Sequence, residues 1–203
     1  MSEAETVILA APVNERDHVM GPSGSNIKGF LYARAKLERT STNMYATGID
    51  LSETKRVQLI ELCNACLAHA VDLQLHCKHA HWNVKGPNFI ALHQLFDQVN
   101  ESVEDYIDLI AERAVQLGGI ANSTAHVVAT WAHMPENDTH SASERDYVQS
   151  LSGALATFGK IAREAIGKSN ELGDVVSADI FTEISRGLEK WLWMVEAHLQ
   201  SQP

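Results

Sequence analysis

The sequence has few cysteines and no long apolar run. Because no apolar stretch approaches the roughly 20 residues that span a bilayer, we expect no membrane helix. The first five residues, Met1–Glu5, are acidic where a secretory signal requires positive charge, so we expect a cytoplasmic protein. Cys63, Cys66 and Cys77 are an odd number of thiols in one predicted helix, and we expect them to be reduced and buried.

Positive charge is also scarce, because 16 Lys and Arg face 26 Asp and Glu, which gives a formal net charge of -10. Surfaces that bind DNA or RNA depend on clustered Lys and Arg that neutralise phosphates. The main body of the chain is therefore not expected to bind nucleic acid, and a cationic partner suits it better. At 203 residues, the chain is long enough for one buried core and an extension.

The first 48 residues differ from the remainder. They are interrupted by Pro12, by the Gly/Ser-rich residues 21–25 and by Gly29, and no long apolar period develops. We interpret residues 1–48 as a flexible amino-terminal arm and residues 49–203 as one helical domain.

Four long helical patterns follow the arm. The first begins at a cap formed by residues 50–53 and runs to about Trp82, and the second runs from near Asn88 to Gly118. A capping box, Ser141-x-x-Glu144, predicts the start of the third helix, and the fourth follows a turn near residue 173. A short helix is predicted at residues 123–131, in the long connection. This order is typical of an all-α, ferritin-like four-helix bundle.

One face of the second helix is acidic. At about 100° per residue, six of its polar side chains fall within about 100° of one another, and no Lys or Arg occurs between Lys85 and Arg113. Such a stripe can be a solvated surface. Carboxylates one turn apart repel each other, however, so an unbalanced run indicates a bound cation. The stripe consists of His93, Asp97, Glu101, Glu104, Asp108 and Glu112.

The stripe contains two pairs of ligands that are each one turn apart. His93 and Asp97 can hold one ion, as can Asp108 and Glu112. The two pairs are separated by about 22 Å along the helix, so one chain cannot close both around the same ion. A two-fold axis through the middle of the helix would place each pair opposite the other pair of a second chain.

Mixed imidazole and carboxylate ligands indicate which metals are suitable. They favour Fe(II), and also Mn(II) or Zn(II), with positions left for solvent. Since the set contains no thiolate, a closed structural zinc site is not expected. His81, across the bend from the second helix, is a candidate for a further nitrogen ligand.

One motif begins with His81 to Gly86 and continues with Asn88–Phe89, His93, Asp97, Asp108 and Ala111–Ala114. This motif strongly resembles that of the family called DNA-binding protein from starved cells (Dps). The resemblance covers roughly residues 50–200. It implies a hollow dodecamer that oxidises Fe(II), preferably with hydrogen peroxide or otherwise with oxygen, and stores the ferric mineral inside.

The resemblance also assigns roles to residues. His81, His93 and Asp97 of one subunit, with Asp108 and Glu112 of its two-fold mate, would form the ferroxidase centre. Trp82 would lie beside the iron, where an indole can intercept oxidising equivalents. Acidic side chains near the third helix would line a three-fold pore for cations, and the candidates are Glu136, Asp138, Glu144 and Asp146.

Three alternatives compete with this interpretation. A nucleoid protein would bind DNA through the short basic stretch of the arm, which contains Lys28, Arg34, Lys36 and Arg39. A purely structural assembly would need partner bases for the acidic face, and the chain does not supply them there. An intrachain di-iron centre would need two Glu-x-x-His pairs in the bundle, but the only such pair, in residues 15–18, lies in the arm.

Overall fold

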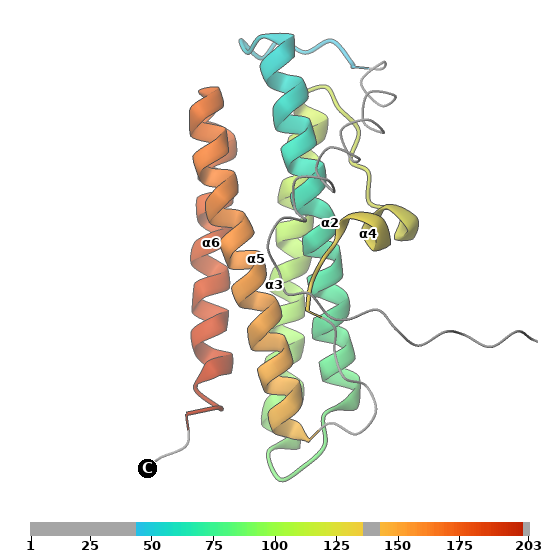
Figure 1. Cartoon of the computed structure of the whole chain (residues 1–203), viewed down its shortest axis with the longest axis vertical. Helices are drawn as coiled ribbons and strands as arrows, with labels where there is room; N and C mark the ends of the chain where they lie inside the picture. The colour runs from blue at the N-terminus through green and yellow to red at the C-terminus, as the bar shows by residue number, and fades with distance from the viewer. Residues whose placement is uncertain (1–43, 136–142, 201–203) are drawn as a thin grey trace, which may run out of the picture. The chain divides into compact units, whose positions relative to one another are not determined.

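The computed structural model describes residues 44–135 and 143–200. These ranges contain five helices and no strand (Figure 1). The predicted all-α, ferritin-like bundle with a short helix in its crossover is therefore confirmed. The helices are α2 (Glu53–Asn83), α3 (Phe89–Gln116), α4 (Ala125–Trp131), α5 (Glu144–Leu172) and α6 (Val175–Glu196).

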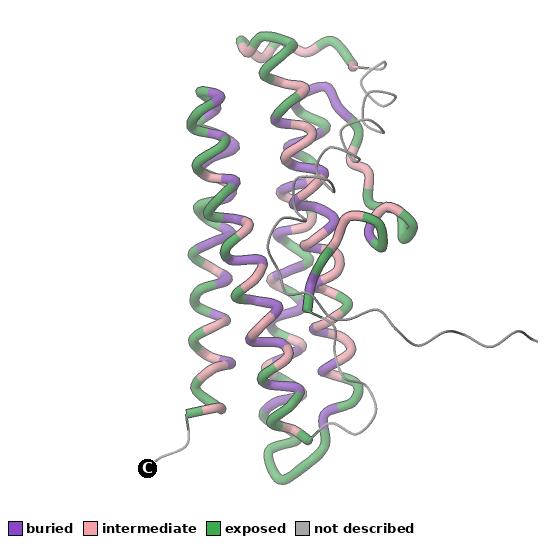
Figure 2. Tube along the Cα trace, in the orientation of Figure 1, coloured by how far each residue is buried: buried purple, intermediate pink, exposed green. Residues whose placement is uncertain are grey.

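The four long helices are arranged as two hairpins that share one core. Helix α2 packs along α3, and α5 packs along α6, while α2 also contacts α5 and α3 contacts α6. In the connection between α3 and α5, the short helix α4 lies against α2 (Figure 1). Each long helix turns a buried stripe inward and an exposed stripe outward (Figure 2).

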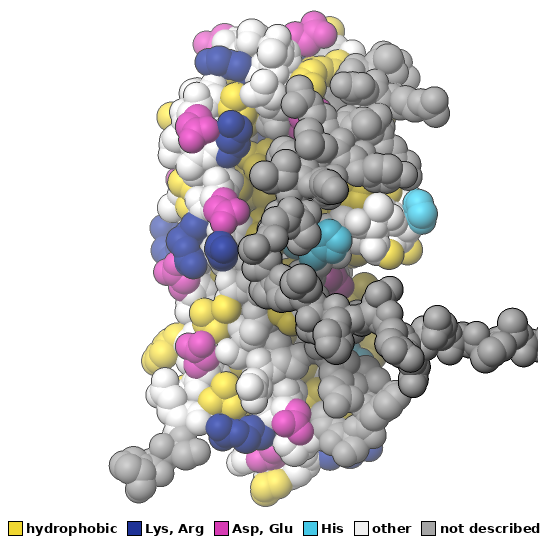
Figure 3. Space-filling view, in the orientation of Figure 1, with side chains coloured by type: hydrophobic (Ala, Val, Ile, Leu, Met, Phe, Trp, Pro, Cys, Tyr) yellow, Lys and Arg dark blue, Asp and Glu magenta, His cyan; other side chains and the backbone are white. Residues whose placement is uncertain are grey.

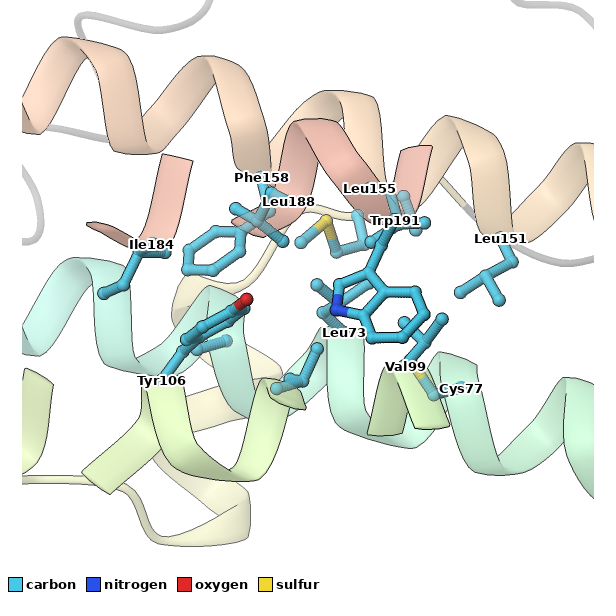
Figure 4. Close-up of a cluster of buried hydrophobic side chains, with 14 of the residues drawn as sticks. Leu73, Cys77, Val99, Tyr106, Leu151, Leu155, Phe158, Ile184, Leu188 and Trp191 are labelled. Atoms are coloured by element: carbon cyan, nitrogen blue, oxygen red, sulfur yellow. The ribbon is translucent and has the colours of Figure 1, made fainter. Parts of the chain in front are cut away.

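Aromatic and aliphatic side chains fill the space between the hairpins. Tyr106 of α3 lies beside Trp191 of α6 and near Phe158 of α5 (Figure 4). Gly187 of α6 leaves room for the Tyr106 ring, because a Cβ atom at residue 187 would overlap the Tyr106 hydroxyl. A residue without a side chain is thus needed where α6 passes over Tyr106.

The three cysteines lie in this core as free thiols, as the sequence predicted. Burial raises the pKa of Cys63 and of Cys77 to about 12, and it raises the pKa of Cys66 further. Thiols with such pKa values stay protonated at neutral pH and are poor nucleophiles and poor metal ligands.

Helix α5 begins with a different capping box from the one predicted. The Ser143 hydroxyl accepts a hydrogen bond from the Asp146 backbone amide, and the Asp146 carboxylate accepts one from the Ser143 amide. The prediction of Ser141 with Glu144 was wrong by two residues, because both serines begin the same pattern, one ending in Glu and the other in Asp. Hydrogen bonds from Ser143 lower the pKa of Asp146. Glu144 is left available for a different contact.

A buried ion pair joins the end of α3 to the start of α6. Two nitrogen atoms of Arg113 donate to Asp174 and Ser177, with Nη2 lying 3.0 Å and 2.9 Å from the two Asp174 carboxylate oxygens. Asp174 is also the N-cap of α6 and accepts from the amides of Val176 and Ser177. One carboxylate therefore neutralises a buried guanidinium and caps a helix.

The predicted arm falls largely outside the described residues. Of residues 1–48, the structure describes 44–48, where the Tyr45 amide donates to the Gly118 carbonyl at 2.8 Å. The basic stretch of residues 28–39 also lies outside, so the arm and its binding of DNA stay predictions. Among the described helices, none combines the length and apolar character needed to cross a bilayer.

Candidate functional site

The turn between α2 and α3 positions the first half of the predicted metal site. Gly86 has a φ of +139°, and a Cβ there would overlap the Glu144 carboxylate. That carboxylate accepts hydrogen bonds from the Asn88 backbone amide at 3.2 Å and from Asn88 Nδ2 at 2.7 Å. The start of α5 therefore fixes the turn that sets α2 against α3.

Two histidines face each other across this turn. His81 Nδ1 lies 2.9 Å from the His93 carbonyl oxygen, and His93 Nδ1 lies 2.8 Å from the His81 carbonyl oxygen. Their rings stack with centroids 3.7 Å apart and planes 22° apart. Since a carbonyl only accepts, each Nδ1 donates the hydrogen bond, which in a neutral imidazole leaves the lone pair on Nε2. Backbone carbonyls commonly fix metal-binding histidines in this way.

Asp97 lies beside His81 but is paired with a lysine. Its Oδ1 lies 3.8 Å from His81 Nδ1 and 2.6 Å from Lys78 Nζ. The hydrogen bond from Lys78 is the main cause that lowers the pKa of Asp97. The expectation that no base balances the acidic stripe was therefore wrong at this position, because the lysine comes from the neighbouring helix.

The other two predicted ligands lie farther along α3. Asp108 and Glu112 are exposed, and 15 residues separate His93 from Asp108, which corresponds to about 22 Å of helix. Within residues 44–135 and 143–200, no three His, Cys, Asp or Glu side chains are already arranged to hold a metal ion. The fold thus brings together His81, His93 and Asp97, while a site shared between chains stays a prediction.

Trp82 follows the ligand candidate His81 on α2, and 70% of its surface is exposed. An indole of this size is normally covered in a folded protein or at an interface. Its exposure in a single chain places an apolar surface next to His81, His93 and Asp97, which together are called the half-site below.

Lys78 was missed by sequence reasoning, although a signal for it was present. It precedes His81 by three residues on α2, and side chains three residues apart share a helix face. Whether this lysine reaches Asp97 depends on which face of α2 packs against α3, and only the tertiary structure shows that. The predicted absence of a base rested on the residues of the second helix alone and could not include a lysine of the first.

Two of the four predicted pore residues have contacts within the chain. Glu144 holds the α2–α3 turn through Asn88, and Asp146 closes the capping box of α5. Glu136 and Asp138 lie outside the described residues. An acidic pore near the start of α5 stays a prediction.

The comparisons with known proteins agree with this architecture. The family described as "Ferritin-like domain" matches residues 60–202. The chain is 39% identical over 158 residues to the DNA protection during starvation protein of Agrobacterium fabrum, a match that covers 78% of this chain and 98% of that protein. The protein of that name from Mycolicibacterium smegmatis is also 39% identical over 158 residues, covering 74% of this chain and 82% of the relative.

Solved structures extend the agreement to three dimensions. Dps from Mycobacterium smegmatis in its tetragonal form has a TM-score of 0.73 at 32% identity, covering 77% of this chain and 96% of that one. DpsC from Streptomyces coelicolor has a TM-score of 0.75 at 26% identity, covering 79% and 94%. With a family match over most of its length and relatives this similar, the chain belongs to the Dps family of ferritin-like proteins.

Proposed function

We propose that this protein is a ferroxidase and iron-storage protein, which oxidises Fe(II) with hydrogen peroxide at sites shared by two chains and holds the ferric mineral inside a hollow dodecamer. The observation that carries the proposal is the pair of stacked imidazoles, His81 and His93, whose Nδ1 atoms are held by backbone carbonyls. The relatives are named for DNA protection during starvation. Removing Fe(II) and peroxide together would serve that end.

The chemistry follows from the donor atoms. The Nε2 atoms of His81 and His93 would bind Fe(II), and Asp97 would exchange Lys78 for the metal. Carboxylates favour the harder Fe(III) product over Fe(II), which helps to drive the oxidation. Two Fe(II) ions each lose one electron, and one hydrogen peroxide accepts both with two protons to give two waters. Because both electrons go to one peroxide, no hydroxyl radical is released.

Two features support a site completed by a second chain. The donors His93 and Asp97 lie near the start of α3, beside His81 of α2, and the exposed acidic residues Asp108 and Glu112 lie toward the other end of α3. A two-fold axis crossing the middle of α3 would bring the two ends of neighbouring chains together. The exposed Trp82 lies next to the half-site, where the second chain would cover it.

Iron oxidation tests the proposal directly. Purified protein should oxidise Fe(II) faster with peroxide than with oxygen, because a shared site lets one peroxide take two electrons. Stopped-flow absorbance of the ferric product measures both rates. Glu104→Ala, on the same acidic face but outside the site, is the matched control and should keep the rate. A His93→Ala/Asp108→Ala protein that oxidises iron as quickly as the unaltered protein would overturn the assignment.

Removing the lysine should tighten metal binding at the half-site. Lys78 and Asp97 are partly exposed, and an ion pair of this kind contributes little free energy. Because the metal would have to displace Lys78 from Asp97, Lys78→Gln should lower the Kd for Co(II) by up to about fivefold. Isothermal titration calorimetry measures the change. Lys85→Gln, an exposed lysine of the turn, is the control and should leave the Kd unchanged. Weaker binding in Lys78→Gln would show that the lysine assists the metal instead of competing with it.

A further inference from the structure

A groove runs along the contact between α2 and α4, outside the core of the bundle. Its volume is about 960 Å³, and its walls are apolar at Leu75 and Val128. The remaining polar lining is dominated by side chains that bind metals, namely Asp72, His76, His79 and His133. None of these belongs to the proposed iron site.

Three of the four donors share one face of α2. Asp72, His76 and His79 are separated by steps of four and three residues, which places them on neighbouring turns. His76 Nε2 lies 3.8 Å from Asp72 Oδ1. His133 follows α4 and lines the groove from the other wall. Histidine side chains are seen beside α4 on the face drawn in Figure 3.

His79 has an unsatisfied nitrogen. Its Nε2 atom is shielded from solvent and has no hydrogen-bond partner among the described residues, although the ring lines the groove. Its ring packs against Tyr147 of α5, with centroids 6.0 Å apart. A buried polar atom without a partner costs free energy, and a bound ion can remove that cost by taking the nitrogen lone pair.

We infer that this groove is a second metal site, which takes a divalent cation that prefers imidazole, such as Zn²⁺, on His76, His79 and His133 with Asp72 beside them. Three imidazoles and a carboxylate are a donor set that suits zinc. No three of these side chains are already arranged around one point in the described part of the chain. The site therefore closes when the exposed His133 rotates toward α2 and the His79 ring turns its Nε2 atom into the groove.

Metal binding here would fasten the crossover to the bundle. Val128 is the one buried residue of α4, so few apolar contacts hold this seven-residue helix. A metal bound by His133 and by the α2 histidines would cross-link the two walls of the groove. The site does not depend on iron oxidation, and its failure would leave the proposed function unaffected.

Zinc titration of the full chain tests the inference. In the His93→Ala/Asp108→Ala background, which disables both halves of the iron site, calorimetry with ZnSO₄ should find about one ion per chain. His133→Ala and His76→Gln should each weaken binding by roughly tenfold or more. His126→Ala removes an exposed histidine of α4 that does not line the groove, and it should bind zinc as the background does.

Protection of α4 gives a second readout. Zinc should slow hydrogen exchange at residues 125–135 in the background protein and in His126→Ala, but not in His133→Ala, whose exposed side chain can be removed without loss of packing. No zinc bound by the background protein, zinc retained by His133→Ala, or equal losses in His133→Ala and His126→Ala would each overturn the inference.

Discussion

Co-expressing the variants His93→Ala and Asp108→Ala in equal amounts should restore about a quarter of the iron-oxidation rate. Random pairing of the two chains brings an intact histidine half together with an intact acidic half in about one site of four. Each variant alone should lose at least roughly tenfold in rate. Recovery follows from the proposed division of ligands between two chains, since a site contained in one chain cannot be repaired by a differently damaged neighbour. Stopped-flow rates of the mixed assemblies measure it.

A matched mixture distinguishes recovery at the site from a general effect of mixing. His93→Ala and Asp97→Ala damage the same half, so every site in their mixture lacks a ligand and no rate should return. Recovery in this control as well, or in neither mixture, would contradict a site divided in the proposed way. Sizing each mixture by light scattering confirms that the variants assemble equally well.

Asp174→Ala should lower the free energy of unfolding by about 3–5 kcal/mol, the typical cost of leaving one partner of a buried ion pair without the other. Arg113 is only 5% exposed, so its guanidinium would stay in the core without a counter-charge. The same substitution removes the N-cap of α6. Urea denaturation at a fixed protein concentration measures the loss. Asp179→Ala, an exposed carboxylate of the same helix, should change stability little.

The effect of this substitution should depend on pH. Burial acts to raise the pKa of Asp174, but hydrogen bonds from Arg113 and Ser177 outweigh burial and lower it below 3.8. A carboxyl group with a lowered folded-state pKa stabilises the protein above its unfolded value and loses that contribution as pH falls through the folded value. The unaltered protein and Asp174→Ala should therefore become more alike below pH 3.8. A constant difference at all pH values would argue against the ion pair.

The helices were predictable because their information is local. Apolar residues at steps of three and four mark each buried stripe, and glycines or capping residues mark the ends. Thus α3 was expected from near Asn88 to Gly118 and is found at Phe89–Gln116. The start of α5 failed since Ser141 and Ser143 begin overlapping capping patterns, and sequence spacing alone does not choose between them.

For the site, the sequence by itself determined the donor types and their spacing along α3, because a helix converts residue number directly into angle and distance. It also determined that His93 and Asp108 are too far apart to hold one ion. Only the tertiary structure decided that the two imidazoles stack across the turn and that Lys78 reaches Asp97. Contacts between helices depend on which faces meet and on how each helix is rotated about its axis. Burial of the whole core fixes these rotations, and the sequence of a single helix does not.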